Sequence, residues 1–81
     1  MHSQSYEFKI KTRREDIDFI NKIMEAYEGI GVVRTKDADA GDLTIVSTSD
    51  FKEDVRMIIE DLDKKWVIAK IVEEGPWSGQ L

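Results

Sequence analysis

The first apolar pattern in the chain alternates residue by residue. In YEFKIK, at 6–11, Tyr6, Phe8 and Ile10 alternate with charged residues. This period of two predicts a strand with one face in the core and the other in water, so both aromatic side chains are assigned to the core. Three further short runs predict strands: IGVVRTK at 30–36, DLTIVST at 42–48 and WVIAKIV at 66–72.

Two longer segments repeat their apolar residues at helical intervals, which predicts helices at 13–28 and 50–65. The first stripe consists of Ile17, Ile20, Ile23, Met24 and Tyr27, with Phe19 and Ala26 at its margin, and the second of Phe51, Val55, Ile58, Ile59 and Leu62. Each segment also opens with a start signal. Thr12 precedes Glu15 by three residues, and Asp50 precedes Glu53 by three, which is the spacing of a capping box.

The glycines and turn residues place the remaining boundaries. Gly29 follows the first helix and is predicted to be its left-handed C-terminal residue. The sequence DADAG, at 37–41, predicts a hairpin loop between the second and third strands. A Gly75-Pro76 turn is predicted to open a tail at 75–81, beyond a core at 5–74.

The element order is therefore strand–helix–strand–strand–helix–strand in a single domain, 1–81. This order predicts an α+β fold, a ferredoxin-like βαββαβ sandwich whose four-stranded antiparallel sheet carries two helices on one face. Depending on strand register, the open face of the sheet is predicted to present Lys9, Lys11, Arg34 or Thr35, Thr44, Val46, Thr48 and Lys70.

Composition narrows the function classes. The 81 residues contain no cysteine, which excludes disulfides and thiolate metal sites and favours the cytoplasm. The first ten residues lack the basic and apolar regions of a signal peptide. Lysine and arginine total 12 against 17 acidic residues, a net charge of −5, and this sign opposes nucleic acid and anionic membranes as partners.

The residue inventory favours a non-enzymatic protein without a cofactor. His2 is the only histidine, so neither a Ser-His triad nor a Cys-His pair can be assembled. Asp37, Asp39 and Asp42 suggest a calcium loop, but Thr48 occupies the twelfth position, where a bidentate acid is required. We therefore assign no metal site, and a metal-dependent enzyme that uses this acidic loop is the third-ranked hypothesis.

Lys11, Thr12, Arg13 and Arg14 form the first candidate site. They lie at a predicted helix N-terminus, where free N–H groups and basic side chains could hold a small anion. The alternative is that the two arginines are solvated or pair with acidic residues immediately after them in the chain.

The second candidate group is a possible interface or ligand contact made by Tyr27, Gly31, Arg34 and Trp77. Gly31 inside a predicted strand indicates a bulge or the close approach of another backbone or ligand. A tryptophan beyond the last strand could dock on the body of the domain or reach a second subunit.

The stretch YEGIGVVRTKDADAGDL resembles a small, uncharacterised bacterial family, a domain of unknown function. Tyr27, Glu28, Gly29, Thr35 and Asp37 carry the resemblance, which implies a single short domain and no assigned activity. The element order is also similar to that of ACT-type regulatory domains, and this likeness implies amino-acid binding between paired sheets. The turn KTRRE lacks the glycine that those domains often have there.

Three hypotheses follow for the function. The first is a small non-enzymatic binding or interaction module that forms a homodimer, since one small core benefits from a partner subunit. The second is an ACT-like sensor of a small anion or amino acid, which would bind at 11–14. The third is the metal-dependent enzyme.

Overall fold

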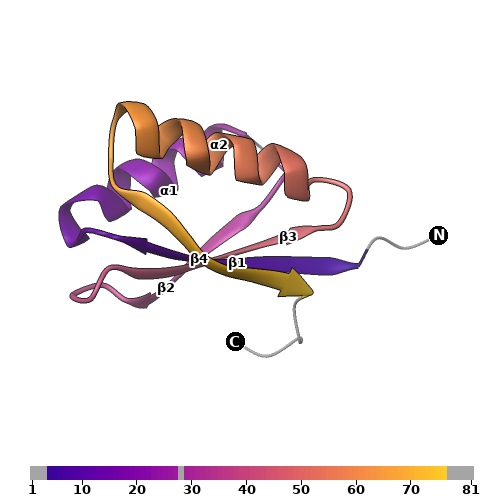
Figure 1. Cartoon of the computed structure of the whole chain (residues 1–81), viewed down its shortest axis with the longest axis horizontal. Coiled ribbons are helices and arrows are strands. Elements are labelled where there is room, and N and C mark those ends of the chain that lie inside the picture. The colour runs from indigo at the N-terminus through magenta and orange to yellow at the C-terminus, as the bar shows by residue number, and fades with distance from the viewer. Residues whose placement is uncertain (1–3, 28, 77–81) are drawn as a thin grey trace.

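The structure is a computed structural model that describes residues 4–27 and 29–76. Its elements follow the predicted order (Figure 1). They are β1 (Ser5–Thr12), a 3-10 turn (Arg14–Asp16), α1 (Ile17–Ala26), β2 (Val32–Asp37), β3 (Asp42–Thr48), α2 (Lys52–Lys65) and β4 (Ala69–Pro76). The predicted α+β class and βαββαβ order are confirmed.

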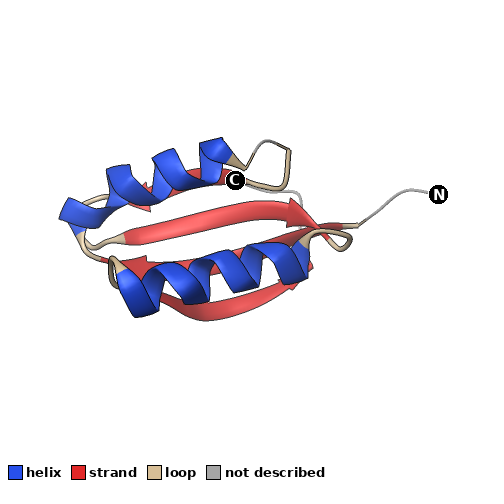
Figure 2. Cartoon of the chain, turned by 90° about the horizontal axis from the view of Figure 1, so that it is seen from above, coloured by secondary structure: helices blue, strands red, loops and turns tan. Residues whose placement is uncertain are grey.

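The four strands form one sheet in the order β2-β3-β1-β4, and every neighbouring pair is antiparallel. Both helices lie side by side over the same face of this sheet, as predicted (Figure 2). β1 and β3 occupy the centre, and β2 and β4 are the edges. Within the described residues, no helix has the length and apolar character needed to cross a bilayer.

The core is a single layer between the helices and the sheet. Phe8 and Ile45 face each other across β1 and β3, and both are fully buried. Ile20 from α1 and Ile59 from α2 are also fully buried and belong to the same apolar cluster. The alternation predicted for β1 is confirmed, since Phe8 and Ile10 are buried while Lys9 between them is exposed.

The helix start predicted at Thr12 is wrong. Thr12 is the last residue of β1, and its hydroxyl donates a hydrogen bond to the carbonyl of Ile68. Arg13 precedes the 3-10 turn, and no side chain caps that turn or α1. Thr12 and Glu15 have the spacing of a capping box, but the Thr12 hydroxyl bonds to Ile68, which lies 56 residues further along the chain.

The boundaries predicted for the fourth strand are also wrong at both ends. Trp66 and Val67 follow α2 in a turn, because the amides of both bond to the carbonyl of Leu62. At the other end Gly75 and Pro76 continue β4, where they pair with Glu7 and Tyr6 of β1. The Gly75-Pro76 turn does not occur, and these two residues belong to the sheet instead of the predicted tail.

The β2–β3 loop is held against the start of the first helical segment. Gly41 has φ +74°, and its carbonyl accepts the amide of Thr12 at 2.8 Å. A Cβ on Gly41 would overlap the carbonyl oxygen of Thr12. Only glycine therefore permits this contact, which joins the hairpin loop to the end of β1.

Gly29 supplies a matched comparison for Gly41. As predicted, it has a left-handed conformation, with φ +82°, but no atom lies within 4 Å of the position that a Cβ would take. We expect Gly29→Ala to cost about 1–2 kcal/mol of unfolding free energy, the conformational penalty alone. Gly41→Ala adds a steric conflict with backbone and is expected to cost at least about 2 kcal/mol more. Urea denaturation measures both, and equal losses would contradict the tight docking of the loop.

Candidate interaction groove between the helices

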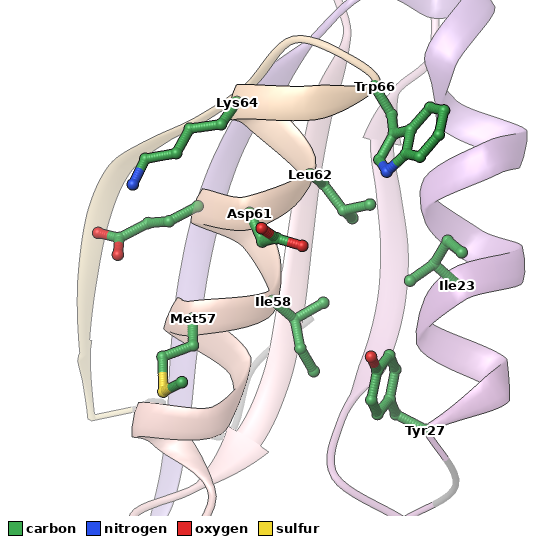
Figure 3. A pocket seen from close by; sticks show the side chains of 9 residues that line it. Ile23, Tyr27, Met57, Ile58, Asp61, Leu62, Lys64 and Trp66 are labelled. Carbon is green, nitrogen blue, oxygen red and sulfur yellow. The ribbon is translucent and has the colours of Figure 1, made fainter.

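An open groove runs between the two helices on the side away from the sheet (Figure 3). Its volume is about 520 Å³. Ile23 and Tyr27 point into it from α1, while Ile58 and Leu62 face them from α2 (Figure 3). The lining is completed by Met57, Glu60, Asp61, Lys64 and Trp66. We call this feature the interhelical groove.

Three large apolar side chains of the groove remain exposed. The exposed fraction is 69% for Trp66, 66% for Met57 and 49% for Tyr27. Tryptophan, tyrosine and methionine are enriched in protein interfaces relative to the rest of the protein surface. The groove thus combines exposed apolar side chains with the charged residues Glu60, Asp61 and Lys64, and its aromatic side chains are of the types that dominate association energies.

The ends of the helices position these side chains. Trp66 directly follows α2, where its amide bonds to the carbonyl of Leu62 at 2.9 Å. Tyr27 directly follows α1, and its amide bonds to the carbonyl of Met24 at 3.1 Å. Each aromatic residue therefore closes the last turn of its helix and projects its ring beside the other helix (Figure 3).

Two of the three exposed residues are not among the contacts predicted from the sequence. From the sequence, Trp66 is assigned to the strand predicted at 66–72, and no contact is predicted for Met57. One signal for Met57 was available, because it lies outside the buried stripe of α2 among charged neighbours, where an apolar residue needs an explanation. Tyr27 was among the predicted contact residues, and the structure places it in the groove.

The other predicted contact residues lie elsewhere. A Cβ on Gly31 would lie 3.2 Å from Ile45 and 3.3 Å from Met24, so the close approach at this glycine is made by the chain's own core. Arg34 pairs in register with Thr44 on the opposite, open face of the sheet. Trp77 and Glu28 lie outside the described residues.

The structure gives each predicted anion-site residue a partner within the chain. The Lys11 ammonium lies 3.0 Å from Asp42, and Arg14 lies 2.7 Å from Asp39. The Thr12 hydroxyl bonds to the backbone just before β4. An anion at this position would compete with these contacts, and the site stays a prediction.

Arg13 completes this group and is held by Asp16. Its Nε donates to the Asp16 carboxylate at 2.8 Å, and the same carboxylate accepts the amide of Ile68 at 3.2 Å. Asp16 is 7% exposed. The Arg13 guanidinium and the Ile68 amide hold the pKa of Asp16 below its ordinary value, against the opposing effect of burial.

A second ion pair joins α2 to the end of β4. Arg56 donates to the carboxylate of Glu74, which also accepts the Tyr6 hydroxyl at 2.8 Å. The hydrogen bond from Arg56 is the main cause that lowers the pKa of Glu74, and the bond to Glu74 raises the pKa of Tyr6. These three groups bind one another, so the arrangement fastens the helix layer to the sheet.

Metal ligands do not gather in the part of the chain that the structure describes. No group of three or more His, Cys, Asp or Glu side chains is placed there so that it could hold a metal ion. Asp37, Asp39 and Asp42 separate around the hairpin: Asp37 accepts the amide of Ala40 at 3.1 Å, and the other two pair with Arg14 and Lys11.

A known protein family covers most of these elements. The model of a family described as a domain of unknown function, DUF4911, matches residues 10–65, which is more than half of the chain. The chain belongs to the DUF4911 family. The predicted membership of a small uncharacterised family is confirmed, and the match spans Tyr27 to Asp37. No curated protein and no solved structure matches the chain.

The match to DUF4911 covers part of the chain and supplies no function. It begins in β1 and ends with the last residue of α2, so it covers both helices and the hairpin but not β4. The family carries no function in its description. Any function for this chain must therefore be argued from its own surfaces.

The buried carboxylate of Asp16 generates a prediction on pH dependence. Because its pKa is lowered in the folded state, Asp16 stabilises the fold above the ordinary pKa of 3.8, and this contribution is lost as the pH falls through the lower folded value. Asp16→Asn keeps an acceptor for Ile68 but loses the charge facing Arg13. We expect a lower urea midpoint near neutral pH, and a smaller loss of stability than the wild type shows between about pH 5 and about pH 2.

Asp18→Asn is the control for this substitution. Asp18 is exposed and pairs with Lys22, one helical turn away, so loss of its charge is expected to leave the midpoint almost unchanged. An Asp16→Asn variant with wild-type stability and wild-type pH dependence would contradict the assigned role of Asp16.

Proposed function

We propose that this domain is a non-enzymatic interaction module that associates with a second copy of itself through the interhelical groove. The observation that carries the proposal is the exposure of three large side chains that line the groove: about two thirds for Trp66 and Met57, and about half for Tyr27. Burying such side chains between two subunits removes apolar surface that the small chain cannot cover by itself.

The charges on α2 favour a second copy as the occupant. Its first turn carries Glu53 and Asp54, and its last turn carries Lys64 and Lys65. Glu53 pairs with Arg56 and Lys65 with Asp61, so within the described residues Asp54 and Lys64 are the two of these charges without an ion pair. In a two-fold dimer with the α2 helices antiparallel, the acidic end of one helix faces the basic end of its partner. A self-complementary charge pattern therefore accompanies the apolar groove.

The edges of the sheet are less suited to self-association. β2 has a bulge at Lys36, between the residues that pair with Leu43 and Asp42. β4 has a bulge at Val72, where its register with β1 shifts. Bulges and charged residues on edge strands obstruct the pairing of one sheet edge with another, so the helix layer is the better candidate.

The composition supports the non-enzymatic part of the proposal, since the chain has no cysteine and His2 is its only histidine. The absence of cysteine also supports a cytoplasmic location. The ACT-like sensor receives less support, because the predicted anion-site residues pair within the chain. The metal-dependent enzyme receives the least, because the loop aspartates separate.

Substitutions in the groove test the proposal. Trp66→Ala removes the more exposed of the two aromatic residues in the groove and is expected to weaken dimerisation by about 30-fold, since such residues contribute about 2 kcal/mol or more. Met57→Gln keeps size and helix propensity but loses an apolar contact, so we expect a smaller effect of about fivefold. Sedimentation velocity over a concentration series gives the dissociation constants.

Val72→Thr is the matched control. Val72 is 68% exposed, almost the same as Met57, but lies on β4 away from the groove, and the change again replaces an apolar residue by a polar one of similar size. We expect its dimerisation to equal that of the wild type. A wild-type chain that remains monomeric at hundreds of micromolar, or equal losses in Met57→Gln and Val72→Thr, would overturn the proposal.

A further inference from the structure

The open face of the sheet contains a threonine that is almost completely buried, although no helix covers it. Thr44 lies on β3 opposite Lys9 of β1 and Arg34 of β2, so a cross-strand row places it between two cationic residues. The predicted alternative is thereby settled: Arg34 shares this face, while Thr35 pairs with Leu43 on the helix side. Thr44 is only 3% exposed, although no helix covers this side of the sheet.

No side-chain hydrogen bond joins the Thr44 hydroxyl to another group of residues 4–27 and 29–76, and this oxygen, unlike that of Thr48, is not sealed from solvent. Thr44 lines a surface hollow of about 350 Å³ together with Lys9, Lys36, Asp42 and Val72. This volume lies within the range of small-molecule sites, about 300–1,000 Å³. A hydroxyl that opens into a hollow can donate its hydrogen to a bound acceptor in place of water.

A second hollow, beside Thr48 of the same strand, differs from the first in the charge of its lining. The buried Oγ1 of Thr48 also lacks a partner within the described chain. The hollow beside it, which Gly31 and Val46 line as well, contains no charged residue. Of these two hollows, the one at Thr44 combines a hydroxyl with cationic side chains.

The charges around the hollow at Thr44 favour an anionic ligand. Arg34 and Lys36 have no carboxylate within ion-pair distance in the described part of the chain, and Lys9 reaches Glu73 only at 3.6 Å. Asp42 pairs with Lys11 at 3.0 Å in a solvent-exposed contact, which offsets part of its charge. Of these two cations of β2, Lys36 lines the hollow and is available to a ligand there, whereas Arg34 lies outside the lining.

We propose that this hollow binds a small carboxylate with a short apolar group. One carboxylate oxygen would accept the Thr44 hydroxyl, and Lys36 with Lys9 would supply the opposite charge. Val72 offers an exposed apolar contact for the remainder of the ligand. The Asp42 carboxylate beside the cations disfavours a dianion such as phosphate. This inference rests on the sheet face alone and is independent of the interhelical groove.

Isovalerate is a suitable probe, because it joins one carboxylate to a branched apolar group. Titration of the full chain, followed by amide NMR shifts, is expected to show saturable changes at Thr44, Lys36 and Val72. The carboxamide analogue isovaleramide has the same shape without the charge, so it is expected to produce no saturable shifts. A glutamate-rich peptide tests whether the carboxylate comes from a polypeptide instead; tighter binding of the peptide at the same amides would overturn the small-molecule assignment.

Two variants test the individual contacts. Thr44→Val is isosteric and removes only the unpartnered hydroxyl, and Lys36→Gln removes the unpaired charge. Each is expected to weaken isovalerate binding by about tenfold. Thr44→Val should not lower the urea midpoint, because no hydrogen bond within the described chain is lost.

Lys64→Gln is the matched control for Lys36→Gln, because it removes an exposed lysine from α2, on the helix side of the molecule. We expect unchanged binding of isovalerate in this variant. The proposal is overturned if Lys64→Gln weakens binding as much as Lys36→Gln does, if chloride at equal ionic strength or inorganic phosphate reproduces the shifts, or if Thr44→Val binds like the wild type.

Discussion

Within the described residues, every apolar side chain that is completely buried lies in one layer, between two helices and one face of the sheet. That layer depends on β1, which β3 and β4 flank on its two sides and which supplies Phe8 and Ile10 to the centre of the core. A short chain can cover only one face of its sheet in this way. Two surfaces are consequently left without cover: the outer side of the helices and the open face of the sheet.

The polar contacts around this layer fasten its margins. Asp16 receives the amide of Ile68, and Asp63 receives the amide of Ala69, so two carboxylates from helical segments hold the start of β4. At the far end of β4 the pair between Arg56 and Glu74 repeats this function. These groups satisfy each other, whereas the exposed side chains of the groove and the unpaired hydroxyl of Thr48 lie on the two uncovered surfaces.

Local patterns predicted the elements well and their long-range partners poorly. The alternation around Phe8 and the left-handed Gly29 were predicted because both depend on the chain's immediate neighbours. Thr12 was misassigned because its hydroxyl bonds to Ile68, and Pro76 because it pairs with Tyr6, each across most of the chain. These pairings depend on the order of strands in the sheet, which a local start or turn signal does not contain.

The interhelical groove also depends on distances between residues far apart in the chain, which a local pattern does not predict. The exposure of Trp66 depends on how far α1 lies from the end of α2, and no spacing within either helix determines that distance. For Thr44, the period of two along the strand predicts that its side chain lies on the open face of the sheet. Its burial between Lys9 and Arg34 depends on the register of the neighbouring strands, which the sequence does not show. Sequence thus indicated which residues face outward, and the structure showed which of them lack a partner.

The environment of Trp66 tests the central claim, that the groove is buried against a second copy. The chain has two tryptophans, so Trp77→Phe leaves Trp66 as the only one. Acrylamide quenching of its fluorescence can then be followed from submicromolar to hundreds of micromolar protein. We predict that quenching decreases and the emission shifts to the blue as the concentration rises, in parallel with dimer formation. Quenching that stays high and constant while the chain dimerises would contradict the account, because the dimer would then use another surface.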